Sequence, residues 1–189
     1  MENLNAYSLA RKQAERAINN RHLYVAYIMQ NLFDPEKYHN ICEIGGGREL
    51  ELAHYLANIY KQVIVYEPND PIKPIAPNLQ LYSKNFTGRE TLQSNVFVSV
   101  CPYLTYYYDE EHEYDEIDRI SSEEVQNKII VPLINSQKEF FIVLSNRDGM
   151  EKVADNIIQQ YSKLVTLSDI DLNERQIEKH KVLIYKKTL

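Results

Sequence analysis

The most informative part of the chain is the sequence NICEIGGGRELELAHYLA at residues 40–57, followed by VIVYEPN at residues 63–69. An apolar run leads into three consecutive glycines, Gly45, Gly46 and Gly47, and a segment with helically spaced apolar residues follows them. Glycine permits positive φ and lets the main chain come close to a ligand, which suits a strand that turns directly into a helix. The pattern predicts a strand–turn–helix–strand unit, and it leaves open whether the turn cradles a ligand or only reverses the chain.

Short apolar runs recur along the rest of the chain. They predict seven strands, at residues 40–44, 62–66, 79–82, 96–100, 139–144, 164–167 and 181–185. Helical spacing predicts one helix over residues 4–32, or two abutting helices that meet at Asn19-Asn20. It also predicts helices over residues 48–60, 121–135 and 148–161, and the second of these three begins with a capping box of Ser121 and Glu124. Four prolines in residues 68–77 preclude a crossover helix there.

This alternation of strands and helices predicts an α/β chain. We expect a three-layer α/β/α sandwich around a seven-stranded, mostly parallel sheet, with the glycine turn at its middle strand, an antiparallel closing strand and an additional N-terminal helix. At 189 residues, the chain fits one domain.

The charge and composition of the chain bear on which classes of partner it binds. The formal net charge is −6, and residues 96–189 hold seventeen acids against eleven Lys and Arg, whereas residues 1–95 hold ten of each. Because nucleic acids are bound largely through Lys and Arg, and no basic patch stands out, no nucleic-acid partner is expected. The two cysteines, Cys42 and Cys101, form no metal-binding motif, so no metal is expected, and the absence of a long apolar run predicts a cytoplasmic protein without a membrane partner.

An acid closes the second predicted strand. Glu67 follows Gly47 by 20 residues, the place at which an acid in a nucleotide-binding βαβ unit binds two ribose hydroxyls. With Glu43 two residues before the first glycine of Gly45-Gly46-Gly47, the chain resembles the class I S-adenosylmethionine-dependent methyltransferases. The resemblance implies a Rossmann-like methyltransferase domain over residues 36–189, preceded by an N-terminal helical segment over residues 1–35.

The same resemblance implies a cofactor site for S-adenosylmethionine. Glu43 would lie near the methionine ammonium, Gly45, Gly46 and Gly47 would pass beneath the methionine and ribose, and Glu67 would bind the ribose. Asn85, which follows the third strand, would contact the adenine amine, with Phe86 near the ring. Glu49 departs from the small residue that the family often carries at this position.

The segment after the fourth strand resembles the family's acceptor loop less closely. In Ser99-Val-Cys-Pro-Tyr103, Val100 and Cys101 replace the polar residue and the proline of amine-directed members. Tyr103 could still stack on a substrate. The acidic, tyrosine-rich segment at residues 103–118 begins here, and we interpret it as either a substrate rim or a solvated loop.

The candidate substrate-rim residues are Cys101, Tyr103, Tyr106 and His112. No catalytic dyad is recognised, which methyl transfer does not require, because it depends mainly on alignment of the reacting atoms. We expect an S-adenosylmethionine-dependent methyltransferase acting on a small molecule or a protein side chain.

Two alternatives stay open. One is a non-catalytic binding or regulatory module of the same fold. The other is a nucleotide-cofactor oxidoreductase, although the dinucleotide fingerprint asks for a third glycine where this chain has Leu50, and Glu43 would repel a pyrophosphate.

Overall fold

The computed structural model describes residues 21–72, 74–90, 94–100, 104–105, 118–119, 121–144, 149–171 and 179–187. Its helices are α2 (Arg21–Leu32), α3 (Glu51–Ala57), α4 (Ser122–Glu124), the π-helix η1 (Val125–Ile130), α5 (Val131–Asn135) and α6 (Met150–Tyr161). Its strands are β1 (Asn40–Ile44), β2 (Gln62–Tyr66), β3 (Leu79–Tyr82), β4 (Val96–Val100), β5 (Leu104–Thr105), β6 (Asp118–Arg119), β7 (Glu139–Leu144), β8 (Val165–Asp171) and β9 (Lys179–Tyr185).

Seven strands form one sheet in the order β3-β2-β1-β4-β7-β9-β8. The first five of these pair in parallel, and β9 pairs antiparallel with both β7 and β8. The predicted mixed sheet and its antiparallel closing strands are therefore confirmed. β5 and β6 form a separate two-stranded antiparallel sheet that the sequence pattern does not predict.

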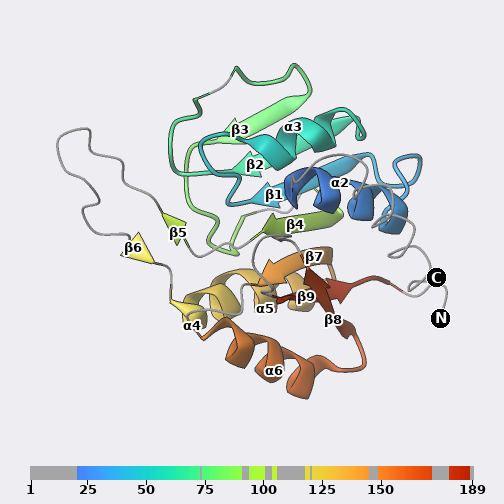
Figure 1. The fold of residues 1–189 in the computed structure, drawn as a ribbon, viewed down its shortest axis with the longest axis vertical. Helices are drawn as coiled ribbons and strands as arrows, with labels where there is room; N and C mark the ends of the chain where they lie inside the picture. The colour runs from blue at the N-terminus through green and yellow to red at the C-terminus, as the bar shows by residue number, and fades with distance from the viewer. Residues whose placement is uncertain are drawn as a thin grey trace.

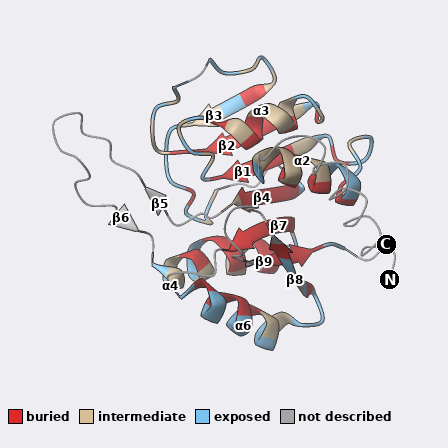
Figure 2. Ribbon diagram, in the orientation of Figure 1, coloured by how far each residue is buried: buried red, intermediate tan, exposed pale blue. Residues whose placement is uncertain are grey.

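Helices cover both faces of the large sheet (Figure 1). On one face, α2 and α3 pack over a core that contains Ile41, Val63 and Val98. On the other face, η1, α5 and α6 pack over a core that contains Ile64 and Phe140. The strands β1, β2 and β7 are buried along most of their length (Figure 2), which explains why they appear in the sequence as nearly continuous apolar runs.

The chain order of the sheet reverses between β1 and β4. From β1 the chain runs outward through β2 to β3, then returns to place β4 on the other side of β1. In open α/β sheets, the carboxyl ends of the strands at such a reversal border the ligand site. The glycine turn follows β1, which is third in the strand order and adjacent to the middle strand β4, so the expectation that the turn lies at the middle strand is wrong by one strand.

The helices differ from the expected ranges for local reasons. α3 begins at Glu51 rather than residue 48, because Gly47 (φ 66°) and Leu50 (φ 48°) both adopt the left-handed conformation. The segment expected as one helix over residues 121–135 contains η1, in which the Val131 N–H donates to the Gln126 carbonyl, five residues back. Pro132 begins the next turn without an N–H, which favours a local change of hydrogen-bond spacing.

The predicted capping box of Ser121 and Glu124 is present. In the predicted N-terminal helix, the structure describes only α2, and the part over residues 4–20 lies outside the described residues. None of the helices in the described ranges is long and apolar enough to cross a lipid bilayer.

Candidate cofactor site

The turn after β1 is built from backbone conformations that favour glycine. Gly45 has φ 74° and donates its N–H to the Tyr66 carbonyl at 2.8 Å, which ties the turn to the end of β2. Gly47 has φ 66°, and the Leu50 N–H donates to its carbonyl at 3.1 Å. A side chain at either glycine would be strained by its φ alone.

Gly46 and Gly47 face different surroundings. A Cβ at Gly46 would lie 2.7 Å from Val65 Cγ1 and 3.1 Å from Leu50 Cδ2, so the main chain here rests directly on the core. A Cβ at Gly47 would meet no heavy atom within 4 Å. The turn is therefore pressed against the sheet on one side and opens onto free space at Gly47 on the other.

Glu43 lies beneath this turn. Its side chain is 2% exposed, it projects from β1 on the same face as Ile41, and its Oε2 atom has no hydrogen-bond partner. Burial raises its pKa to about 8, the negative charge of Glu67 adds to the rise, and a backbone hydrogen bond from Ala53 opposes it. A buried carboxyl group with an unpartnered oxygen is costly to ionise unless a cation comes close.

Glu67 lies at the end of β2, facing the turn. Its Oε2 accepts the Gly47 N–H at 2.8 Å, and its Oε1 accepts the backbone N–H of Asn69 at 2.9 Å and the side-chain amide at 2.7 Å. These three donors hold the carboxylate in one orientation, at the position expected for a ribose-binding acid. The structure thus brings together Glu43, the glycine turn and Glu67, as the sequence predicts.

The end of β4 is fixed to the end of β1 by a buried hydroxyl. The Ser99 side chain, which has no solvent exposure, donates to the Ile44 carbonyl at 2.6 Å. This bond spans the two strands between which the sheet order reverses. It holds the carboxyl edge of β4 beside the glycine turn.

The other predicted residues are exposed, belong to the core or lie outside the described ranges. Asn85 is exposed in the segment after β3, and Glu49 is exposed on the turn rather than lying beneath it. Phe86 is buried against Tyr66 and Phe97, so its ring belongs to the core. The candidate rim residues all lie outside the described part of the chain: Cys101, Tyr103, Tyr106 and His112.

Sequence reasoning missed two residues that shape the site, Asn69 and Ser99. Asn69 stands two positions after Glu67, a spacing at which an amide readily turns back onto a carboxylate, and this signal could have been noticed. Ser99 is the one polar residue in the apolar strand β4, and it stands near the strand's carboxyl end.

The donor set fits S-adenosylmethionine. Glu43 offers an unpartnered buried oxygen to a cationic ammonium group, Gly47 offers open space, and Glu67 offers an oriented carboxylate to a ribose diol. The described residues contain no group of three or more His, Cys, Asp and Glu side chains that could hold a metal ion.

Comparison with known proteins supports the fold. No protein family profile and no curated protein sequence matches the chain. Among solved structures, the methyltransferase domain of a bacterial CtHen1 is 9% identical with a TM-score of 0.59, and the match covers 88% of this chain and 98% of that one. The N-terminal domain of human METTL16 in complex with SAH is 11% identical with a TM-score of 0.57, covering 87% and 69%. The 23S rRNA methyltransferase ErmE is 14% identical with a TM-score of 0.53, covering 86% and 67%.

The chain therefore has the Rossmann-like fold of the class I S-adenosylmethionine-dependent methyltransferases. At these identities the likeness establishes the fold and leaves the substrate open.

The comparison also corrects one expectation. ErmE acts on 23S rRNA, and the catalytic domain of METTL16 is also found in complex with an RNA hairpin. The expectation of no nucleic-acid partner is therefore wrong as an inference for a chain of this fold. The net charge of the whole chain was the wrong quantity to judge by, because nucleic acids are bound by local surfaces.

Proposed function

We propose that this chain is an S-adenosylmethionine-dependent methyltransferase whose methyl acceptor is RNA. One observation carries the proposal. The unpartnered Glu43 oxygen, the open space at Gly47 and the oriented Glu67 carboxylate meet at the carboxyl edge of the sheet, where the strand order reverses. The RNA acceptor is supported by the RNA-directed proteins among the similar structures.

In this proposal, each residue of the site has a physical task. Glu43 attracts the ammonium group of the cofactor, since a nearby cation offsets the cost of ionising a buried carboxyl group. Glu67 accepts hydrogen bonds from the ribose hydroxyls, and Gly47 leaves the space that the cofactor needs. The bound cofactor supplies a methyl group that its sulfonium already activates.

The proposed reaction also requires that the methyl acceptor be aligned with the cofactor. The Ser99 hydrogen bond to the Ile44 carbonyl keeps the end of β4 at a fixed distance from the glycine turn, so an acceptor placed over β4 stays in register with the cofactor. Holding two reactants in line can supply much of the barrier reduction by itself. The site therefore needs no acid–base dyad to fit the proposed reaction.

A transfer assay tests the proposed activity. The full chain is incubated with total cellular RNA and S-adenosylmethionine that carries a tritiated methyl group, and label retained in RNA is counted before and after ribonuclease treatment. We expect ribonuclease-sensitive label with the wild type and a loss of about tenfold or more with Glu67→Ala, because charged hydrogen bonds to the ribose are lost. Glu36→Gln, which changes an exposed acid in the turn after α2, is the matched control and should retain wild-type transfer.

Two results would overturn the proposal in different ways. If the wild type binds S-adenosylhomocysteine but labels neither RNA nor protein, the RNA acceptor is wrong, and the chain either methylates a small molecule or is a binding module of this fold. If the label enters protein and resists ribonuclease, the cofactor assignment stands and the RNA acceptor is wrong.

A further inference from the structure

The outer strands of the sheet carry a polar surface that the cofactor site does not use. In the described parts of the connections around β3, which are residues 67–72, 74–78, 83–90 and 94–95, the chain forms no helix. Consequently Gln80 is exposed on β3, and Gln62 on β2 and Tyr82 on β3 are only partly buried. The register places these side chains on the sheet face of Ile64, which pairs with Gln80.

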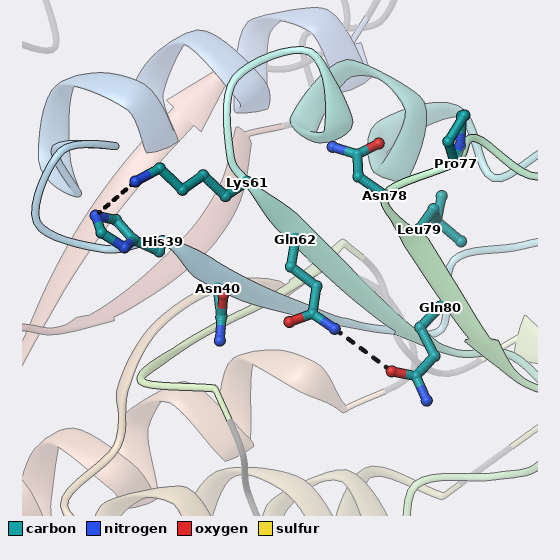
Figure 3. Close-up of a pocket in the computed structure, with 8 residues that line it drawn as sticks. All are labelled: His39, Asn40, Lys61, Gln62, Pro77, Asn78, Leu79 and Gln80. Carbon is teal, nitrogen blue, oxygen red and sulfur yellow. Dashed lines mark hydrogen bonds between the residues drawn. The ribbon is translucent and has the colours of Figure 1, made fainter.

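A hollow of about 580 Å³ lies at the amino ends of β1, β2 and β3. Asn40, Gln62 and Gln80 point the same way from neighbouring strands, and Lys61 and His39 approach each other at one end (Figure 3). The Lys61 Nζ atom lies 3.5 Å from His39 Nε2. Among the described residues, those that line the hollow include no acid, and their polar groups are amides, an imidazole and one cation.

From this hollow, side-chain contacts lead along β3 toward the carboxyl edge. The Gln62 amide lies 3.5 Å from Gln80 Oε1, and the Gln80 amide donates to the Tyr82 hydroxyl at 2.8 Å. The Tyr82 ring stacks on Tyr66 with centroids 5.1 Å apart and planes 16° from parallel. Lys84 Nζ lies 5.9 Å from the centroid of the Tyr82 ring. We call Lys61, Gln62, Gln80, Tyr82 and Lys84 the polar strip.

The polar strip has the chemistry of a surface that binds single-stranded nucleic acid. Amide side chains pair with base edges, a half-buried tyrosine offers a face for base stacking, and a lysine at each end can meet phosphates. Lys84 Nζ lies 3.9 Å from the carboxylate of Glu90, which accepts hydrogen bonds from the backbone N–H and hydroxyl of Thr87. The Glu90 side chain is only 9% exposed, so the accessible charge of the strip is positive.

The length and position of the polar strip suit an extended single strand of nucleic acid. It runs from the amino to the carboxyl edge of the sheet, over roughly 13 Å at the rise of a β-strand, and so spans a few nucleotides. At the carboxyl edge it ends near Tyr66, whose carbonyl accepts the Gly45 N–H of the glycine turn. A duplex would meet one edge strand only at isolated points, whereas a single strand can follow it with its bases turned to the protein.

We propose that the polar strip and the hollow bind a single-stranded segment of the RNA acceptor, with one nucleotide seated between Lys61 and Gln80 and a base stacked on Tyr82. This inference rests on the proposed function, because it takes RNA to be the acceptor.

Fluorescence anisotropy with a labelled single-stranded RNA of about 12 nucleotides and mixed sequence tests the proposal on the full chain. Lys61→Glu and Gln80→Glu change exposed side chains and should each weaken binding at least fivefold at low salt. Tyr82→Ala should weaken binding about fivefold or more, whereas Tyr82→Phe, which keeps the ring, should stay within about twofold of the wild type. The matched control is Lys152→Glu, an exposed lysine on α6, which lies at the far end of the molecule from β3 (Figure 1).

Salt dependence adds a readout that misfolding does not mimic. Lys61→Gln should reduce the slope of log binding constant against log salt by about 0.7, the value for one phosphate contact on a single strand. Equal weakening by Lys152→Glu, wild-type binding by both strip charge variants, or equal binding of a duplex of the same sequence would each overturn the strip proposal. S-adenosylhomocysteine binding, measured on the same proteins, separates the two claims: if it is normal while the strip variants bind RNA like the wild type, only the strip proposal fails.

Discussion

Glu43 shows how one buried carboxyl group links stability to ligand chemistry. It is 2% exposed, one of its oxygens has no partner, and burial raises its pKa to about 8 from the ordinary glutamate value of 4.5. Between these two values, the folded chain retains a proton that the unfolded chain releases. The free energy of unfolding should therefore fall as pH rises through this interval.

Replacing Glu43 by a neutral isostere should remove that dependence. In the ligand-free protein, the free energy of unfolding of Glu43→Gln should rise relative to that of the wild type by a few kcal/mol as the pH is raised from about 5 to about 9. The reason is that only the wild type must ionise a buried group. Urea unfolding at both pH values measures the gain. A difference between the two proteins that stays constant with pH would contradict the assigned burial and charge state of Glu43.

At the scale of elements, apolar patterning predicted strands well and helix ends less well. β1, β2, β3, β4 and β7 have the expected bounds, because each is a buried run whose apolar residues stop where the strand stops. β8 runs on to Asp171, four residues past the expected end, because its partner β9 stabilises polar residues that periodicity alone assigns to a loop. The π-helix depends on hydrogen bonds around Pro132, which periodicity does not reveal.

The residues of the candidate site likewise fall into two groups, those that the sequence predicted and those that it did not. Local motif spacing predicted Glu43, the glycine turn and Glu67, because all of them lie in the first βαβ unit or directly after it. Ser99 and the polar strip depend on which strands become neighbours. Ser99 reaches across 55 residues to Ile44, and Gln62 reaches Gln80 through the pairing of β2 with β3.

The glycine turn allows stability and ligand binding to be separated. Gly46→Ala should lower the free energy of unfolding by about 1–3 kcal/mol, because its Cβ would lie 2.7 Å from Val65 Cγ1. Gly47→Asn should cost about 1 kcal/mol or less, since asparagine tolerates the left-handed conformation and the space there is open. The same Gly47→Asn variant should bind S-adenosylhomocysteine at least tenfold more weakly, because its side chain occupies the space proposed for the cofactor.

Denaturant unfolding and isothermal titration calorimetry on the two glycine variants check these expectations. If Gly47→Asn bound S-adenosylhomocysteine like the wild type, the open space at Gly47 would not be the cofactor cradle.

For the molecule as a whole, the net charge of the chain differs from the charge balance of the part that carries the proposed binding sites. The net charge of −6 arises in residues 96–189, whereas the polar strip and the cofactor motifs lie in residues 1–95, where acids and bases balance. At physiological salt, charges further apart than about 8 Å are largely screened, so the charge close to the outer strands, rather than the net charge of the chain, governs RNA binding there. The topology puts both features on the β3-β2-β1 side of the sheet, with the strip ending at the carboxyl edge that borders the glycine turn.

The glycine turn, Glu43 and Glu67 are proposed to form an S-adenosylmethionine site, and calorimetric titration with S-adenosylhomocysteine measures binding at this site. We predict binding at a single site in the wild type, weakened about tenfold or more in Glu67→Ala and unchanged in Glu36→Gln, because losing charged hydrogen bonds costs roughly 1.5–3 kcal/mol. Binding of NADH together with no heat from S-adenosylhomocysteine would contradict the claim and assign the turn to a dinucleotide.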